Sequence, residues 1–186
     1  MHKIAHIYGS DREGRFCDIV AGWALSELQR LPGVEADVVD PARLDLPRRF
    51  GTDSAAVHHL RERLAAADAF LVVTPEYNHS FPACLKALVD SANEQWHAKP
   101  VAFVSYGGLS GGLRAVEQLR QVFAELHAVP LRDTVAFPNA WDAFADGRPV
   151  RQEAVRAFRH MLARLTWWST ALKEARLREP YAAAAA

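Results

Sequence analysis

AFLVVTPEYNHSFP, residues 69–82, is the stretch of sequence that decides the fold. Its first six residues are almost wholly apolar and include β-branched side chains, which is typical of a strand covered on both faces. Pro75 and Pro82 then exclude regular strand or helix between them. The loop therefore projects at the carboxyl end of a strand covered on both faces, as strands of a parallel sheet between two layers of helices are.

The same alternation continues outward along the chain in both directions. Short apolar runs alternate with longer stretches of helical period, which predicts five β-α units in one doubly wound layer. The predicted strands are residues 3–8, 35–39, 69–74, 100–105 and 132–137. The predicted helices are residues 13–31, 55–67, 82–92, 112–126 and 151–178. We therefore expect one α/β domain over residues 1–180.

Three segments lack a clear period. Residues 40–52 are rich in Pro, Arg and Asp and read as a long surface loop, and residues 181–186 form a low-complexity tail that we expect to fray. Residues 137–149 carry Trp141 and Phe144 among turn formers. Aromatic side chains in a polar loop often pack on something, so we expect these two to contact the domain, a cofactor edge or a partner subunit.

Composition excludes several classes of protein. The chain has 186 residues, enough for one domain, and its 22 acidic residues balance its 22 basic ones, so no charge excess indicates nucleic acid or an anionic membrane. No apolar stretch approaches the ~20 residues that span a bilayer. A first strand beginning at Lys3 leaves no room for a signal peptide. Cys17 and Cys84 match neither a disulfide framework nor metal-ligand spacing, and the histidines show no zinc spacing, so we expect a cytoplasmic protein without a metal.

The first chemical segment is Tyr8-Gly9-Ser10-Asp11-Arg12-Glu13-Gly14-Arg15-Phe16, between the first strand and the first helix. The start of a helix offers unpaired N–H groups and a positive dipole end, and Ser10, Arg12 and Arg15 add a hydroxyl and two cations. The spacing is neither that of a P-loop nor G-x-G-x-x-G, which leaves a pocket suited to a monophosphate. The alternative is an ordinary helix cap with two solvated arginines.

The second and third segments follow the third and fourth strands. In Thr74–Pro82, the amide of Asn78 suits the edge of a planar heterocycle, and Tyr77 offers an aromatic face; a purely structural crossover loop is the alternative. Four glycines in Ser105–Gly112 let the backbone approach a flat ligand and expose N–H groups to it; here the alternative is a flexible turn. Ligands of open α/β sheets bind at this edge.

A rival interpretation comes from Gly108-Leu109-Ser110-Gly111-Gly112, which matches the G-x-S-x-G nucleophile elbow of hydrolases. Asp133 or Asp142 with His160 would complete a triad around Ser110. Four residues separate this serine from the strand, however, and no HGGG-like oxyanion segment is present, so hydrolysis ranks below the binding of a flat, phosphate-bearing ligand. Elsewhere, Trp167 and Trp168 are taken as core by default, with at least one ring free for an interface.

Taken together, the three segments resemble the NADPH-dependent FMN reductase family, which includes quinone, azo and chromate reductases of the flavodoxin-like fold. The resemblance covers residues 3–137. The motif G-S-x-R matches at Gly9, Ser10 and Arg12, P-E-Y-N-x-S at residues 75–80, and S-Y-G-G at residues 105–108. The following L-K-N-A-[LI]-D pattern is met at Leu85, Lys86 and Asp90 only, and Gly112 with Arg114 fits G-G-x-R.

The resemblance implies a three-layer sandwich with a five-stranded parallel sheet in the order 2-1-3-4-5, and bound FMN. Its implied cofactor-binding residues are Ser10, Arg12, Arg15, Phe16, Pro75, Glu76, Tyr77, Asn78, Ser105, Tyr106, Gly107 and Gly108. Amides of Asn78 and the Gly107-Gly108 turn would favour the reduced ring, and no side chain is needed as a general acid or base.

The resemblance also implies the reaction and the assembly. NADPH or NADH would deliver two electrons through the flavin to a quinone, flavin, azo or similar small-molecule acceptor; an electron carrier or redox sensor without turnover is the alternative. A homodimer or tetramer would complete each flavin site from a neighbouring subunit, which gives Trp141 and Trp168 a use. Arg48, Arg49 and Arg114 are candidates for the 2′-phosphate of NADPH.

Overall fold

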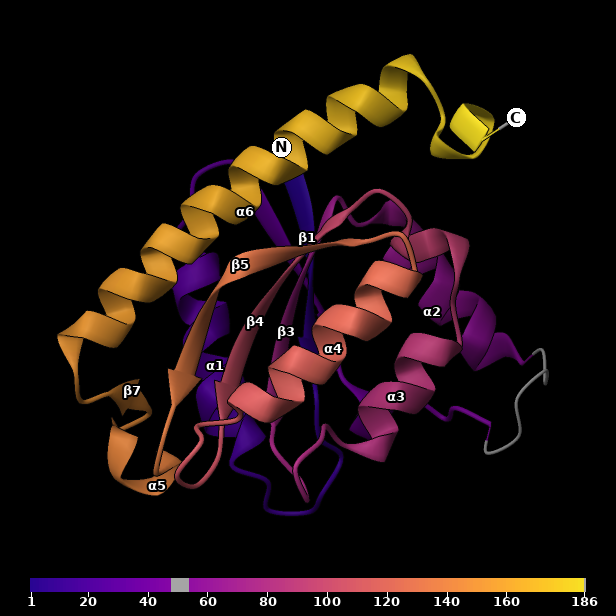
Figure 1. The fold of residues 1–186 in the computed structure, drawn as a ribbon. Helices are drawn as coiled ribbons and strands as arrows, with labels where there is room; N and C mark the ends of the chain where they lie inside the picture. Colours follow the sequence, from indigo (N-terminus) through magenta and orange to yellow (C-terminus); the bar gives the residue numbers. More distant parts are fainter. Residues whose placement is uncertain (48–53, 186) are drawn as a thin grey trace.

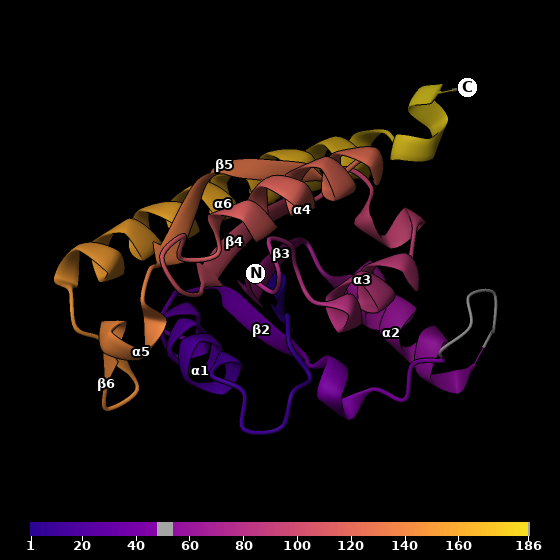
Figure 2. The same cartoon turned by 60° about the horizontal axis from the view of Figure 1, so that its bottom comes forward.

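The computed structural model describes residues 1–47 and 54–185, and a single parallel sheet organises them (Figure 1). The sheet has the predicted order β2-β1-β3-β4-β5. Its strands are β1 (His2–Tyr8), β2 (Val34–Val39), β3 (Ala69–Pro75), β4 (Pro100–Tyr106) and β5 (Val129–Phe137). All carboxyl ends point to one edge, the lower one in Figure 1, which comes forward in Figure 2.

Helices cover both faces of this sheet. The apolar sides of α1 (Cys17–Leu28) and α6 (Gln152–Arg178) pack with strand residues in one core. The second core lies on the other face, under α2 (Ala55–Ala66), α3 (Ala83–Asp90) and α4 (Leu113–Glu125). Every residue of β3 and β4 is buried, which explains their continuous apolar sequence. The predicted three-layer arrangement is therefore confirmed.

Short elements fill the segments without a period. They are the 3-10 helices η1 (Pro41–Arg43) and η3 (Tyr181–Ala185), the helix α5 (Ala140–Ala143) and the hairpin strands β6 (Phe144–Ala145) and β7 (Arg148–Pro149). A further 3-10 helix, η2 (Glu94–Trp96), lies between α3 and β4. Residues 137–149 showed no period because α5 and the hairpin are each too short to repeat one. Residues 48–52 of the predicted surface loop lie outside the described residues. Among the helices that the structure describes, none is long and apolar enough to cross a membrane.

Two sequence-based expectations were wrong in detail. The first helix begins at Cys17 rather than at residue 13, because Gly14 takes a left-handed φ of 62° that ends any continuous helix there. Strand β5 begins at Val129, three residues before the prediction. Within the predicted tail, residues 181–185 form the 3-10 helix η3, and the Tyr181 hydroxyl shares a hydrogen bond of 2.8 Å with Nδ1 of His127.

The two adjacent tryptophans of α6 are also not core. Trp167 is 64% exposed and Trp168 is 38% exposed. Ser169, the next residue, contacts His2 at the start of β1, with 3.0 Å between its Oγ and the ring Nδ1. The pair therefore lies toward the amino edge of the sheet, away from the loops at the carboxyl edge.

Candidate functional site

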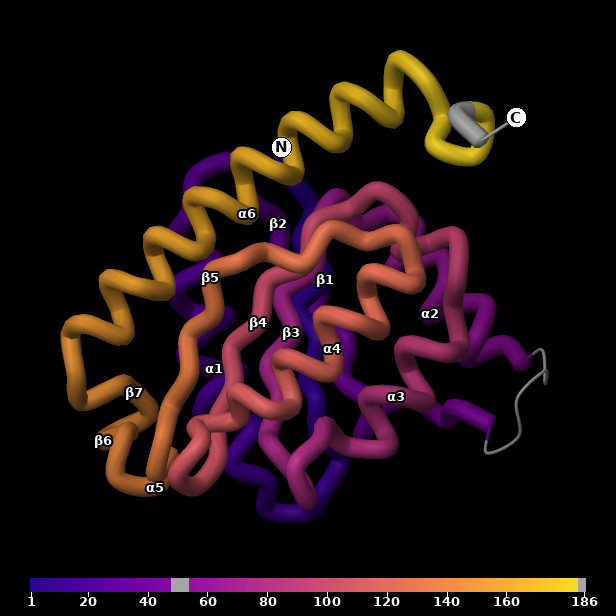
Figure 3. Tube along the Cα trace, in the orientation of Figure 1, coloured from indigo at the N-terminus to yellow at the C-terminus, as the bar shows by residue number. Residues whose placement is uncertain are grey.

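Three loops meet at the carboxyl edge of the sheet, and they are the three that the sequence singled out. Residues 9–16 follow β1, residues 76–82 follow β3, and residues 107–112 follow β4. Because β1, β3 and β4 are neighbours in the sheet, their loops emerge side by side at the bottom of the tube trace (Figure 3). Each loop contributes something different to the site.

The first two loops are joined by Ser10, Arg12 and Tyr77. The buried Ser10 hydroxyl lies 2.9 Å from the Tyr77 hydroxyl, and the two share a hydrogen bond. The exposed Arg12 guanidinium lies 3.7 Å from the centre of the Tyr77 ring, a cation–π distance. Three of the predicted ligands thus form one cluster that presents a cation and hydroxyl groups.

Arg15 is held differently from Arg12. Its guanidinium donates to both carboxylate oxygens of Asp40 at 2.7 and 2.6 Å, to Asp18 and to the carbonyl of Ser10. This hydrogen bond to Asp40 raises the pKa of Arg15. Burial by itself would raise the pKa of Asp40, but the hydrogen bonds from Arg15 and the Ala42 amide lower it overall. Arg15 therefore connects the first loop to the end of β2, and its guanidinium is paired with two carboxylates.

Glu76 joins the second loop to the third. Its carboxylate accepts from the Ser110 hydroxyl at 2.6 Å, from the Arg114 guanidinium at 2.9 Å and from the Arg114 amide at 3.2 Å. Burial would raise the pKa of Glu76, but the hydrogen bonds from Ser110 and Arg114 lower it overall. These contacts neutralise Arg114, a candidate for the NADPH 2′-phosphate; Arg48 and Arg49 lie outside the described residues.

The rest of the second loop is a tight reversal. Tyr77 and Ser80 exchange two backbone hydrogen bonds of 2.8 and 3.0 Å. Asn78 and His79 between them take left-handed φ values of 49° and 71°. Asparagine accepts this conformation better than most residues, so the turn presents the Asn78 amide without a glycine.

The glycine turn, residues 107–112, is packed from below. A Cβ on Gly112 would lie 2.7 Å from Cβ of Ser105, and its φ is 86°. The buried Ser105 hydroxyl donates to the carbonyl of Gly111 at 2.9 Å. The Gly107 N–H donates to the carbonyl of Phe137 at 3.2 Å. Ser105 and Gly107 therefore support the turn from inside, and exposed Gly108 forms its outer surface.

An aromatic wall closes one side of the site. The Phe16 ring centre lies 5.9 Å from that of Tyr106, 5.8 Å from that of Phe144 and 6.4 Å from that of Trp141. Tyr106 is buried, which raises the pKa of its hydroxyl, so it supports Phe16 from within. Trp141 is 67% exposed, so this wall presents a large apolar ring to solvent.

The structure does not assemble the hydrolase triad. Ser110 donates to Glu76, whereas Asp133 pairs with Arg164 at 2.6 Å. His160 lies exposed on α6, in the helical layer opposite that of α4, which follows Ser110. None of the predicted partners reaches this serine, so the G-x-S-x-G match reflects a glycine-rich turn.

Sequence reasoning missed Asp40. It stands directly after β2, so its carboxylate lies at the same edge as the three loops. A carboxylate directly after the predicted strand 35–39 stands at the same sheet edge as the three loops, and its position in the sequence indicates this. The signal was present in the sequence.

A parallel sheet in the order 2-1-3-4-5, with three ligand-binding loops at the carboxyl edge where the strand order reverses, defines a flavodoxin-like protein. The family model of the NADPH-dependent FMN reductases matches residues 2–142. The chain belongs to this family. It is therefore a flavin-dependent oxidoreductase that works with FMN and NAD(P)H, which confirms the expected class of enzyme and rules against an electron carrier without turnover.

Individual relatives agree with this assignment. The chain is 32% identical over 149 residues to an NAD(P)H-dependent FMN reductase of Schizosaccharomyces pombe, with 74% of each chain covered. It is 36% identical over 137 residues to an NADPH:quinone oxidoreductase of Arabidopsis thaliana, covering 68% of this chain and 70% of the relative. The solved structure of FerB, an NAD(P)H:acceptor oxidoreductase from Paracoccus denitrificans, has the same fold, with a TM-score of 0.74 and 21% identity over 91% of this chain and 98% of FerB.

Proposed function

We propose that FMN lies across the three loops, with its phosphate at residues 9–16 and its ring between residues 75–80 and the glycine turn. The main support for this proposal is the position of Arg12. This arginine is exposed beside the buried Ser10 hydroxyl, and no carboxylate in the described part of the chain forms an ion pair with it. A cation next to a hydroxyl group, in a loop that leads into a helix, suits a phosphate.

The glycine turn fits a flat ring. A Cβ added at Gly108 would meet nothing within 4 Å, so this residue borders open space. Because the Gly107 N–H is used by Phe137, Gly108 and Asn78 are the better candidates for donating to the ring. Bound FMN would supply the chemistry, by taking a hydride from NAD(P)H and passing two electrons to an acceptor. The chain itself orients the ring and keeps one apolar side open beside Phe16.

The acceptor is a small planar molecule such as a quinone or a flavin. The quinone and FMN reductases among the relatives favour this class, and the exposed Trp141 ring beside Phe16 offers an apolar surface on which such a molecule stacks. We further propose that a homodimer or tetramer brings Trp141 of one subunit to the flavin of its neighbour. The thiols Cys17 and Cys84 are both free, which suits the reducing cytoplasm.

The visible spectrum of the purified protein and NADPH oxidation with a quinone test this function together. We expect flavin absorption, release of FMN rather than FAD on denaturation, and quinone-dependent oxidation of NADPH. Trp141→Ala should raise the KM for the quinone and leave the affinity of the three loops for FMN unchanged. A colourless protein that takes up no added FMN, or one whose Ser110 reacts with a fluorophosphonate, would contradict the proposal.

A further inference from the structure

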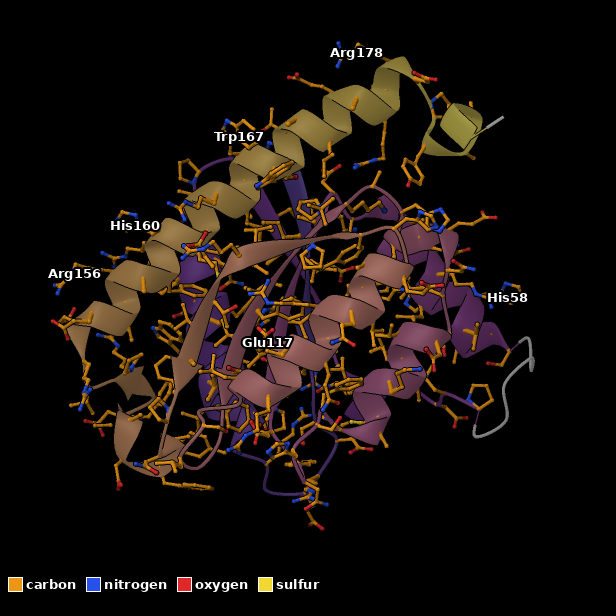
Figure 4. The ribbon with its side chains drawn as sticks, in the orientation of Figure 1. His58, Glu117, Arg156, His160, Trp167 and Arg178 are labelled. Carbon is orange, nitrogen blue, oxygen red and sulfur yellow. The ribbon has the colours of Figure 1, made fainter. Side chains whose placement is uncertain are left out.

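The outer side of α6 carries an exposed stripe. In the described part of the chain, one of its members contacts another element: the Thr170 hydroxyl lies 3.2 Å from Nε2 of His2 at the start of β1. Its members share a spacing of alternately four and three residues, and all are exposed. They are Arg156, His160, Ala163, Trp167, Thr170 and Glu174. In Figure 4, Arg156, His160 and Trp167 all project from α6 away from the sheet. The buried positions of the helix, among them Phe158 and Leu165, face the opposite way and pack on the core.

This spacing is that of a helix that pairs with another helix. Alternating steps of four and three keep one seam in line with a partner, as in coiled coils. The seam from Arg156 to Glu174 would run about 27 Å at ~1.5 Å per residue. A helix whose only task is to cover a sheet needs one apolar side, and α6 already has it. The exposed tryptophan on its second side therefore calls for an explanation of its own.

The stripe is complementary to itself when reversed. If a second α6 lies antiparallel so that Ala163 faces Trp167, then Trp167 faces Ala163 as well, and each large ring meets a small residue. In the same register Arg156 faces Glu174 at both ends. His160 then faces Thr170. A two-fold axis requires one surface to match itself in this way. Each contact between the two stripes either pairs a large side chain with a small one or joins opposite charges.

We propose that the outer stripe of α6 is a subunit interface, where it pairs antiparallel with the same stripe of a second copy of this chain. Glu174 forms no ion pair with another described residue, and Arg156 is bound only to exposed Glu153, at 2.8 Å, a contact worth little by itself. Trp167 is the anchor, since a buried tryptophan contributes most to such contacts. The pairing deepens the oligomer proposed above by naming a contact surface, and it needs no bound flavin.

Charge reversal tests the pairing and its register. Glu174→Arg or Arg156→Glu alone places like charges face to face at both ends, so we expect the dissociation constant of this interface to rise at least about tenfold. The double variant Arg156→Glu/Glu174→Arg exchanges the charges and should restore association. Glu125→Arg, the same change on the exposed end of α4, is the matched control and should leave association unchanged.

Sedimentation velocity over a dilution series gives the number of subunits, with circular dichroism, FMN content and NADPH oxidation measured on the same samples. We expect each single reversal to halve the subunit number at intermediate concentration while FMN content and turnover remain. Trp167→Ala should act in the same direction. A monomeric parent protein at every concentration, or a double variant that stays as dissociated as the folded single variants, would overturn the proposal. Loss of FMN in every variant and in the parent would instead count against the flavin site.

Discussion

The first loop and the glycine turn lie at the same edge of the sheet, each after a buried strand, but different forces hold them. Residues 9–16 are fixed mainly by Arg15, whose ion pair with Asp40 reaches across to the end of β2. Residues 107–112 are fixed mainly by close packing, since Gly111 and Gly112 leave no space for a Cβ. The first loop therefore depends on charge and so on pH, whereas the turn depends on shape.

Gly112→Ala should have the largest effect, because it tests the packing of the turn directly. The new Cβ would clash with Ser105 and with the Tyr106 backbone while φ stays left-handed, so we expect the free energy of unfolding to fall by about 4 kcal/mol. Gly108→Ala meets open space and should cost less than about 1 kcal/mol. Urea denaturation of the FMN-free proteins measures both, and equal losses would show that the turn is not held by packing.

Asp40→Ala tests the charge that holds the first loop. The side chains of Asp40 and Arg15 are 5% and 8% exposed, so Asp40→Ala removes the buried partner of a largely buried cation and leaves it with the exposed Asp18 and the Ser10 carbonyl, at a cost of about 3 kcal/mol. Asp18→Ala removes the exposed partner of the same arginine and should cost less than about 1 kcal/mol. FMN affinity, followed by flavin fluorescence, should weaken in the first variant only. If the two variants behave alike, Asp40 does not position the loop.

Acid should weaken the same ion pair gradually. The pKa of Asp40 in the folded chain lies below its ordinary value of 3.8, so the pair contributes fully above that pH and its contribution is lost as the pH falls through the folded pKa. Asp40→Asn does not titrate. The difference in free energy of unfolding between the parent and this variant should therefore be constant from pH 7 to about 5 and shrink below about 3.8. A difference that stays constant down to pH 3 would contradict this account.

Arg12→Ala should have the smallest effect on the fold and a clear effect on the cofactor. Arg12 is exposed and stacks on Tyr77, so its loss should change the free energy of unfolding by less than about 1 kcal/mol. Loss of one charged contact to the phosphate should raise the Kd for FMN about tenfold. Arg12→Lys keeps the charge, so its Kd for FMN should lie between those of the parent protein and Arg12→Ala. An unchanged Kd in both variants would remove Arg12 from the phosphate site.

Much of the fold could be predicted because its signals are local. The strand order came from the resemblance, whereas the existence of five strands followed from short apolar runs that alternate with helical stretches. One error fell where a single residue changes the backbone, as at Gly14, and the sequence also gave no sign of the contact between Tyr181 and His127. Side-chain contacts of this kind leave no periodic trace in a sequence.

The site was predicted by position better than by role. Sequence placed Ser10, Arg12 and Tyr77 at one edge, and the structure brings them together. It could not separate Arg12 from Arg15, because Asp40 lies 25 residues beyond Arg15 along the chain and only the pairing of β1 with β2 brings their loops close.

The sequence by itself determined the α/β layers, through apolar runs that alternate with helical stretches. It also determined the three loops, whose motifs carry the resemblance that implies FMN. Tertiary structure alone decided which charges are free and which are paired, and which face of α6 remains uncovered. Ion pairing and burial depend on neighbours that are distant in the chain. Arg15 is therefore locked, Arg12 is available, and Trp167 is exposed, although nothing in their own segments distinguishes these outcomes.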